Sequence, residues 1–177
     1  MAELNLKDYI CNIPDFPKPG IIFRDVTTLI QDPKAFGESC RLLAEAARDL
    51  KPDCIAAPEA RGFLFAAPVA LELGCRLALI RKPKKLPRAS ISETYALEYG
   101  TDTIAIHEDA IPAGSRVLIL DDLLATGGTV AACRKLVERL GSTVVGYGFL
   151  IELSSECDGR KVLEADGTAK VFSIIDY

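Results

Sequence analysis

Hydrophobic residues in this chain occur either in short aliphatic runs or in longer segments with helical spacing. Residues 33–50 are a segment of the second kind. Its apolar residues recur three or four positions apart, at Phe36, Cys40, Leu43, Ala44 and Ala47. Asp32 and Pro33 precede them and are typical of an N-cap and a first helical position. The pattern therefore predicts a helix over 33–50.

The rest of the chain alternates between predicted strands and predicted helices. The predicted strands are the aliphatic runs 54–57, 76–80, 117–120, 144–151 and 171–175. The other predicted helices, 62–73 and 129–140, end before a glycine. Because such alternation joins strands by crossover connections, we expect an α/β fold with a central parallel sheet flanked by helices. Residues 1–30 have no helical repeat and are predicted to form a small hood within a single domain, 1–177.

Composition narrows the class of protein. The chain has 177 residues, is 49% hydrophobic and carries a formal net charge of −4. A binder of nucleic-acid backbones would normally be basic, so we expect no nucleic-acid partner. The sequence contains neither an apolar run of about 18 residues nor a basic N-terminal region followed by an apolar one. We therefore expect no membrane partner and a cytoplasmic location.

Cysteine and histidine give no sign of a metal centre. The six cysteines are scattered without a Cys-x-x-Cys pair, and the single histidine is His107. A structural zinc site is therefore not expected. We interpret the cysteines as reduced, mostly buried thiols, and His107 as a residue at a strand end or on the surface.

The most specific chemical signal follows the aliphatic run 117–120. Asp121 and Asp122 come directly after it, at the edge of the sheet where open α/β folds bind ligands. A loop of small residues then opens the next predicted helix, and it consists of Ala125, Thr126, Gly127, Gly128 and Thr129. Small side chains let backbone N–H groups surround a phosphate, and the helix N-terminus adds a favourable dipole.

Two carboxylates beside an anion-binding loop require a partner other than the phosphate. The 2′ and 3′ hydroxyls of a ribose would donate to them, so the segment 121–129 suits a ribose 5-phosphate. No lysine follows the glycines as in a P-loop, and the chain has no G-x-G-x-x-G dinucleotide motif. The competing interpretation is an ordinary strand followed by an acidic turn.

Basic residues follow two other predicted strands. After the strand 76–80, five cations stand within eight residues, namely Arg81, Lys82, Lys84, Lys85 and Arg88, and Pro83 and Pro87 exclude a regular helix there. Such a run is often only solvated surface, yet its place at the ligand-binding edge would suit a pyrophosphate leaving group. Arg61, at the start of the predicted helix 62–73, could grip pyrophosphate with two hydrogen bonds or could be a surface arginine.

Together these motifs resemble the type I phosphoribosyltransferases, and among them the enzymes that act on adenine. The resemblance rests on residues 121–129 (DDLLATGGT) and on four further motifs in the same order, which are 16–25 (FPKPGIIFRD), 60–65 (ARGFLF), 81–87 (RKPKKLP) and 95–100 (YALEYG). It covers essentially the whole chain. It implies Mg²⁺-dependent transfer of 5-phosphoribose from 5-phosphoribosyl 1-pyrophosphate to N9 of adenine, giving AMP and pyrophosphate in purine salvage. It also implies a homodimer.

The resemblance also assigns roles to residues that would contact the pyrophosphate leaving group and close the site. It implies a flexible loop over roughly 81–100 that closes over the site, with Lys82 and Lys85 as pyrophosphate contacts and Arg81 as a further one that could reach across a dimer interface. Closure would keep water from an activated ribosyl centre. A cis peptide is implied at 59–60, although the preceding Ala57 and Pro58 differ from some relatives. Mg²⁺ is expected to bind mainly through substrate and water, with no protein ligand set.

Base recognition is expected in the hood. Phe23 offers an aromatic face for a purine, and the backbone N–H and C=O of Ile22 suit the Watson–Crick edge of adenine. Arg24 could donate to a ring nitrogen, and the resemblance places Leu153 on the opposite face of the base. The resemblance implies Glu98 near N7 of adenine, where it would need a raised pKa to donate a proton. Arg61 is expected to be the second catalytic residue.

Two alternatives to this function remain on sequence grounds. A phosphoribosyltransferase for another base would keep the sugar site and differ in the hood. No lysine stands near 22–24 to donate to the oxygen of an oxopurine, which favours adenine. A non-catalytic sensor of 5-phosphoribosyl 1-pyrophosphate would bind without turnover, and the intact basic run and Glu98 weigh against it.

Overall fold

The core of the protein is a five-stranded sheet, seen in a computed structural model that describes residues 4–96, 100–165 and 167–177. The strand order is β4-β3-β7-β8-β9, and every neighbouring pair is parallel. The strands are β3 (Cys54–Pro58), β4 (Arg76–Ile80), β7 (Arg116–Leu124), β8 (Thr143–Glu152) and β9 (Lys170–Asp176). The predicted α/β class, parallel sheet and five core strands are confirmed.

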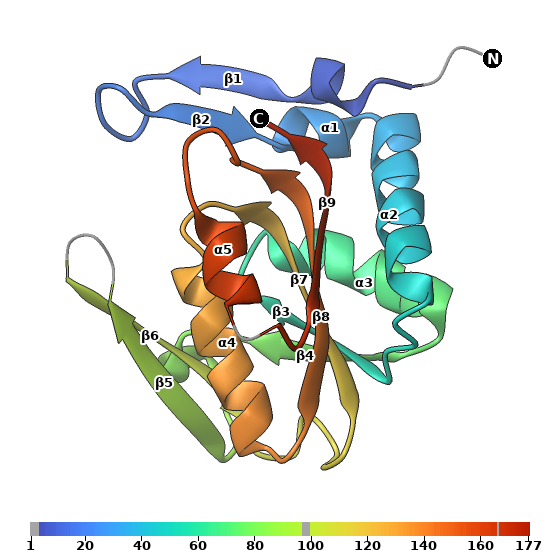
Figure 1. The fold of residues 1–177 in the computed structure, drawn as a ribbon, viewed down its shortest axis with the longest axis vertical. Helices are drawn as coiled ribbons and strands as arrows, with labels where there is room; N and C mark the ends of the chain where they lie inside the picture. The colour runs from blue at the N-terminus through green and yellow to red at the C-terminus, as the bar shows by residue number, and fades with distance from the viewer. Residues whose placement is uncertain (1–3, 97–99, 166) are drawn as a thin grey trace.

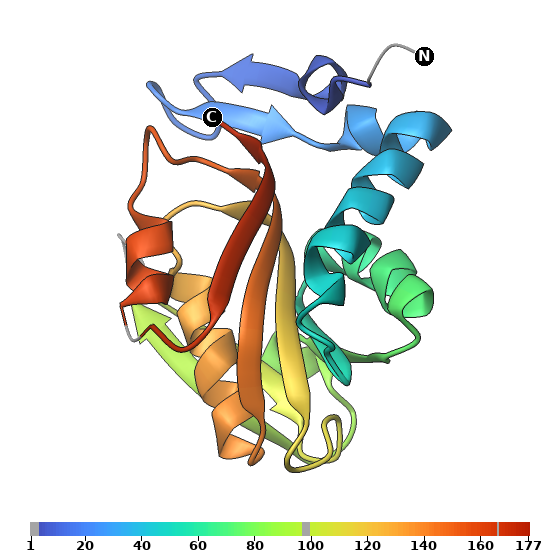
Figure 2. The same ribbon diagram turned by 45° about the vertical axis from the view of Figure 1, so that its right-hand side comes forward.

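Helices cover both faces of this sheet, as Figures 1 and 2 show. One face carries α2 (Pro33–Arg48) and α3 (Gly62–Leu73), and the other carries α4 (Gly128–Arg139) and α5 (Gly159–Glu164). In β7, Leu118 and Leu120 pack in the core on the α2 and α3 side, whereas Val117 and Ile119 pack on the α4 side. A strand buried on both faces needs an unbroken aliphatic run, which explains the sequence at 117–120.

The predicted helices begin within one residue, and end within two residues, of the predicted limits. Asp32 caps α2, because its carboxylate accepts hydrogen bonds from the backbone N–H groups of Lys34 and Ala35, both at 2.9 Å. The left-handed Gly74, with φ of 67°, ends α3. α5 was not predicted, because its six residues are too few to show a periodic pattern.

Residues 4–31 form a layer above the carboxyl ends of the strands (Figure 1). They comprise a 3₁₀ turn (Leu6–Tyr9), an antiparallel pair of β1 (Cys11–Pro14) and β2 (Ile22–Asp25), and the one-turn helix α1 (Thr27–Gln31). The sequence indicated no helix before residue 33, and the two helical turns correct that expectation. Both are too short to produce a helical repeat.

The segment expected to be a loop over roughly 81–100 contains a strand within its described part, 81–96. It contains a 3₁₀ turn (Pro83–Lys85) and β5 (Ser90–Ala96), which pairs antiparallel with β6 (Thr101–His107). β5 has few apolar residues and was missed for that reason. The resulting hairpin lies beside α4 (Figure 1). His107 is the last residue of β6, in line with the expected strand end.

β7 is also longer than predicted. The sequence places Asp121 and Asp122 after a strand that ends at Leu120, but the strand continues to Leu124, which pairs with Glu152 of β8. Pairing with a longer neighbour extends a strand through residues that alone have little strand tendency. The two acids are therefore fixed by the sheet itself and not by a turn. Within the described ranges, no helix is both long enough and apolar enough to span a membrane.

We expect the cysteines to differ widely in reactivity toward iodoacetamide at pH 8. Cys11 is exposed, whereas burial raises the pKa of Cys40 to about 11 and of Cys54 to about 12. At pH 8 the thiolate of either buried residue is about one part in a thousand or less, and its sulfur is shielded from the reagent. Peptide mass mapping should find Cys11 modified first and all six modified in denaturant. Equal labelling of Cys54 and Cys11 in the native protein would contradict the described core.

Candidate active site

Two adjoining cavities lie at the carboxyl end of the sheet. One, of about 210 Å³, is lined by Arg61 and residues 121–130. The other, of about 250 Å³, is lined by residues 58–61 together with Lys82, Tyr95, Asp102, Ile104, Asp121, Asp122 and Thr129. The two cavities share Arg61, both aspartates and Thr129. Motifs that are far apart in the sequence thus meet in one place.

The first cavity is an anion cradle built from the loop between β7 and α4. Gly127, the N-cap of α4, has a left-handed backbone with φ of 80°, and no side chain caps the helix. The first backbone N–H groups of α4 therefore lack intrahelical partners, and the positive end of the helix dipole faces the loop. This is the arrangement that binds phosphate at a helix N-terminus.

The cradle is braced from behind by Gly159, the first residue of α5. A Cβ atom on Gly159 would stand 2.1 Å from the carbonyl oxygen of Ala125, and one on Gly127 would stand 3.1 Å from the carbonyl oxygen of Gly159. Only glycine permits this close approach of two backbones. The sequence analysis missed Gly159, because the local pair Asp158 and Gly159 indicates only a turn.

The two aspartates sit at the floor that both cavities share. Asp122 is only 5% exposed, and its Oδ2 lies 2.9 Å from Nε of Arg61 without an aligned hydrogen bond in the described chain. Oδ1 of Asp121 accepts a hydrogen bond from the backbone N–H of Asp122 at 2.9 Å. It lies against the start of α3, where a Cβ on Gly62 would come within 2.7 Å of it.

Both carboxyl groups are costly to ionise in this place. Burial raises the pKa of Asp121, and the charge of Asp122 raises it further. Burial also raises the pKa of Asp122, although the Arg61 guanidinium opposes the effect. Buried carboxylates gain most from ligand groups that donate hydrogen bonds. The pair is therefore suited to a diol and unsuited to a bare phosphate.

Arg61 connects the acids with the hood. It follows the cis peptide between Glu59 and Ala60 that the sequence led us to expect, and it stands at the N-cap of α3. Its guanidinium carbon lies 5.3 Å from the centroid of the Phe23 ring. Arg61 thus touches a sugar-binding candidate on one side and a base-binding candidate on the other.

Three of the five basic residues in the run 81–88 gather at the second cavity, on two carboxylates. Glu59 is nearly buried and contacts Nε of Arg81 at 2.8 Å and Nζ of Lys85 at 3.1 Å. Although burial favours the neutral acid, the hydrogen bonds from Arg81 and Lys85 outweigh it and lower the pKa of Glu59. Lys82 is paired with Asp102 of β6. The sequence analysis found the three cations but neither acid.

The hood residues predicted for the base lie near Arg61. Ile22 is exposed, and Phe23 is half-buried with the Phe16 ring edge-on at 5.2 Å. Arg24 is more deeply engaged than expected, because it donates to Asn12 at 2.7 Å and to Glu156 at 3.2 Å.

Two base-site predictions concern residues outside the hood. Leu153 follows β8 and is only 9% exposed, and its backbone N–H donates to the carbonyl of Leu124 at 3.0 Å. It therefore stands at the end of β7, just before the cradle. Glu98 lies outside the described residues.

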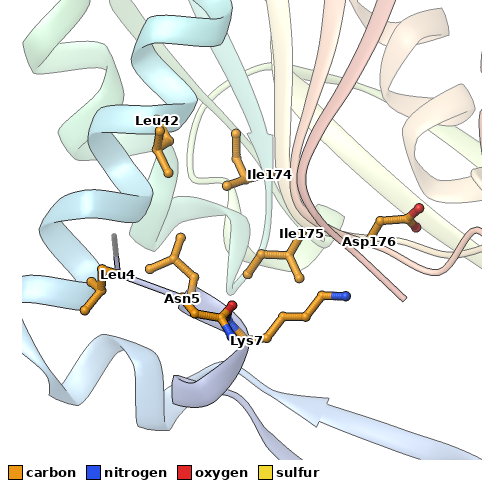
Figure 3. Close-up of a pocket in the computed structure, with 8 residues that line it drawn as sticks. Leu4, Asn5, Lys7, Leu42, Ile174, Ile175 and Asp176 are labelled. Carbon is orange, nitrogen blue, oxygen red and sulfur yellow. Dashed lines mark hydrogen bonds between the residues drawn. The ribbon is translucent and has the colours of Figure 1, made fainter. Parts of the chain in front are cut away.

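A third cavity, of about 410 Å³, lies away from these residues. Figure 3 shows it between the first residues of the chain, α2 and β9, with Leu42 and Ile174 on one side and Leu4 and Asn5 on the other. Its lining mixes apolar residues with Asn5, Lys7 and Asp176, and it brings together neither an acid pair nor an anion cradle. In the described ranges, no group of three or more His, Cys, Asp or Glu residues could hold a metal ion.

Comparison with known proteins agrees with this geometry. Residues 25–175 match the phosphoribosyl transferase domain. A curated relative, the adenine phosphoribosyltransferase of Desulfitobacterium hafniense, is 51% identical over 177 residues, the full length of both chains. The crystal structure of adenine phosphoribosyltransferase from Thermoanaerobacter pseudethanolicus is 52% identical, with a TM-score of 0.92 over 97% of this chain and 98% of that one. The Saccharomyces cerevisiae enzyme, solved with adenine and an iminoalditol bisphosphate, is 39% identical over 96% of both chains, with a TM-score of 0.84.

Proposed function

The chain belongs to the phosphoribosyl transferase family, and we propose that its reaction is the transfer of 5-phosphoribose from 5-phosphoribosyl 1-pyrophosphate to N9 of adenine. The products are AMP and pyrophosphate, so the protein is an enzyme of purine salvage. One observation carries the assignment. The uncapped start of α4, the acid pair and the basic residues line two cavities that share a floor. This order would suit the 5′-phosphate, the ribose and the pyrophosphate of the substrate.

The sugar phosphate occupies the first cavity in this proposal. The backbone N–H groups and hydroxyls of residues 125–129 bind the 5′-phosphate, and Asp121 and Asp122 accept hydrogen bonds from the ribose hydroxyls. Support comes from the hydrogen-bond acceptors that the two acids leave unsatisfied. Asp122 is buried, Asp121 is half-buried, and Asp122 Oδ2 has no aligned donor in the described chain. Negative charge beneath the ribose also stabilises the positive charge that develops at C1 as the leaving group departs.

Pyrophosphate occupies the second cavity. Arg61 and Lys82 line it, and Arg81 and Lys85 stand beside it on Glu59. We propose that these cations take up the charge of the departing pyrophosphate. Mg²⁺ fits the site as a substrate complex, because in the described chain no group of three or more His, Cys, Asp or Glu residues is placed to hold a metal ion. This ion usually binds through one or two carboxylates together with substrate phosphates. When bound, it neutralises part of the pyrophosphate charge.

Adenine binds between the hood and Leu153. Phe23 supplies a ring face, Ile22 supplies its backbone N–H and C=O, and Leu153 closes the other side. Arg24 chiefly ties the hood to the segment after β8, through Asn12 and Glu156. Its Nε is buried and has no hydrogen-bond partner in the described chain, and we propose that it donates to a ring nitrogen. We propose Glu98 as the residue that donates to N7.

The proposal extends to a homodimer and a cytoplasmic location. Four leucines on α3 and on the edge strand β4, two elements in contact, are exposed: Leu71 is 85% exposed, and Leu64, Leu77 and Leu79 are at least 36% exposed. Large exposed apolar side chains often mark an interface, and a second copy would cover them. Sedimentation equilibrium at a monomer mass would refute the dimer. Cys11, Cys40, Cys54, Cys75 and Cys133 form no disulfide, which suits a reducing compartment.

Product analysis tests the function directly. The protein is mixed with 5-phosphoribosyl 1-pyrophosphate, Mg²⁺ and equimolar adenine, hypoxanthine, guanine, xanthine and orotate, and the nucleotides are separated by chromatography. We expect AMP, released with an equal amount of pyrophosphate. Another nucleotide would overturn the base assignment and keep the sugar site. Binding of 5-phosphoribosyl 1-pyrophosphate without any nucleotide would make the protein a sensor.

We expect the Phe23→Ala variant to lose affinity for adenine alone. Stacking of a base on an aromatic ring is worth about 1–3 kcal/mol, so KM for adenine should rise about 10-fold or more while KM for 5-phosphoribosyl 1-pyrophosphate stays within about threefold. Steady-state kinetics with each substrate varied in turn measures both. Ile22→Ala is the matched control, because Ile22 is proposed to act through its backbone. Equal losses in the two variants would contradict a stacking role for Phe23.

A further inference from the structure

Tyr95 and Asp102 are cross-strand partners in the hairpin of β5 and β6 that lies beside α4. Facing residues in an antiparallel pair carry their side chains on the same side. Both line the second cavity together with Lys82 and Thr129. Neither residue has a role in the proposed binding of phosphate, ribose, pyrophosphate or adenine.

The Tyr95 hydroxyl reaches the anion cradle. It lies 3.0 Å from Oγ1 of Thr129, and its ring lies beside the backbone of Gly128. Desolvation by burial raises the pKa of Tyr95 above its usual value, so at neutral pH the side chain is a phenol that donates one hydrogen bond. That hydrogen bond goes to Oδ2 of Asp102 at 3.3 Å. The oxygen of Tyr95 is then free to accept from Thr129.

Asp102 pairs with Lys82, the lysine that is proposed to bind pyrophosphate. Its Oδ2 is paired with Nζ of Lys82, and its Oδ1 accepts from the backbone N–H of Thr103 at 2.8 Å. The hydrogen bond from Lys82 lowers the pKa of Asp102, so the acid is charged at neutral pH. A lysine ammonium has three donors, and Lys82 can keep Asp102 while it donates to a phosphate oxygen.

We propose that Asp102 and Tyr95 are positioning residues, with Asp102 fixing the Lys82 ammonium in the pyrophosphate site and Tyr95 fastening this pair to the 5′-phosphate cradle at Thr129. A long flexible side chain binds better when it is fixed beforehand, because less freedom is lost on binding. The arrangement joins the two anion sites on either side of the ribose through a continuous chain of contacts. The inference rests on the proposed function, because it requires a substrate that carries pyrophosphate.

Binding measurements with three probes test the proposal. Calorimetry would give dissociation constants for Mg²⁺ pyrophosphate, ribose 5-phosphate and 5-phosphoribosyl 1-pyrophosphate. Asp102→Asn should weaken the two pyrophosphate-bearing ligands about 10-fold and leave ribose 5-phosphate within about twofold, since one charge-assisted contact is lost. Tyr95→Phe should weaken all three about threefold or more, because the link to Thr129 is lost as well.

Two further variants separate positioning from general damage to the fold. In a Lys82→Met background, Asp102→Asn should have no further effect on pyrophosphate binding, because the lysine that it positions is gone. Asp109→Asn is the matched control. It removes another ion pair near the hairpin, that of Asp109 with Arg88, and both side chains are exposed. It should leave all three dissociation constants unchanged.

The outcomes are distinct. Equal weakening of ribose 5-phosphate and pyrophosphate in Asp102→Asn, or a full effect of this change without Lys82, would overturn the positioning role and leave the proposed function intact. Failure of the unmodified protein to bind any of the three probes would overturn the proposed function and this inference together. Selective weakening of pyrophosphate, absent in the Lys82→Met background, is the expected result.

Discussion

Replacing Asp122 by asparagine should lower kcat/KM for 5-phosphoribosyl 1-pyrophosphate about 100-fold or more. Asparagine keeps the shape but not the charge, so the ribose hydroxyl loses a hydrogen bond to an ionised acceptor, worth about 1.5–3 kcal/mol. The Arg61 guanidinium, 2.9 Å away, also loses its counter-charge. Each 1.36 kcal/mol of lost transition-state stabilisation is a tenfold loss in rate, so the two effects together give the expected size.

Steady-state kinetics and thermal unfolding separate chemistry from stability in this variant. Asp158→Asn is the control, because Asp158 is exposed, pairs with Lys161 and has no proposed part in the reaction. It should behave as the unmodified enzyme. A loss below about threefold in Asp122→Asn would remove Asp122 from the ribose site. Removal of a buried charge should not lower the unfolding temperature, since burial opposes ionisation of this group.

Gly159→Ala is the second change with a large expected effect, because its new methyl group would meet the carbonyl oxygen of Ala125 at 2.1 Å. A backbone atom cannot move aside as a flexible side chain can, so the cradle must shift by about an ångström. Overpacking of this kind costs about 1–3 kcal/mol, and a misplacement of that size in a binding site costs about 100-fold in rate. We expect a lower unfolding temperature and a raised dissociation constant for ribose 5-phosphate.

Gly37→Ala is the matched control for this change. Gly37 stands within α2, and a Cβ there would meet nothing within 4 Å. Alanine in a helix interior should raise stability by about 0.5–1 kcal/mol and leave the kinetics unchanged. Unaltered binding of ribose 5-phosphate by Gly159→Ala would show that α5 does not brace the cradle.

The predictions that succeeded depend on neighbours in the sequence. A run such as 117–120 is apolar because both of its faces are covered, and the spacing in 33–50 records one helix face, so each element could be inferred from its own residues. Where the local sequence pattern is weak, pairing with an adjacent strand determines the secondary structure. Pairing with β8 carries β7 on to Leu124, and pairing with β6 turns 90–96 into a strand.

The proposed site likewise has one part that could be inferred from adjacent residues and one part that could not. The cradle at 125–129 and the acids before it are contiguous, so the sequence alone brings them together and indicates the ligand. The carboxylates that hold the cations are distant in sequence, since Glu59 and Arg81 are 22 residues apart and Lys82 and Asp102 are 20 apart. No local pattern reveals such partners.

The sequence by itself determined the α/β class, the order of the core strands along the chain and the chemistry of the main motifs, because each depends on residue type and short-range spacing. Only the tertiary structure decided which groups meet. It placed Gly159 behind the cradle, tied Arg24 to Glu156 across 132 residues, and set Tyr95 between Thr129 and Asp102. The physical reason is that hydrogen bonds and steric contacts act over a few ångströms, and only packing of the whole chain brings distant residues within that range.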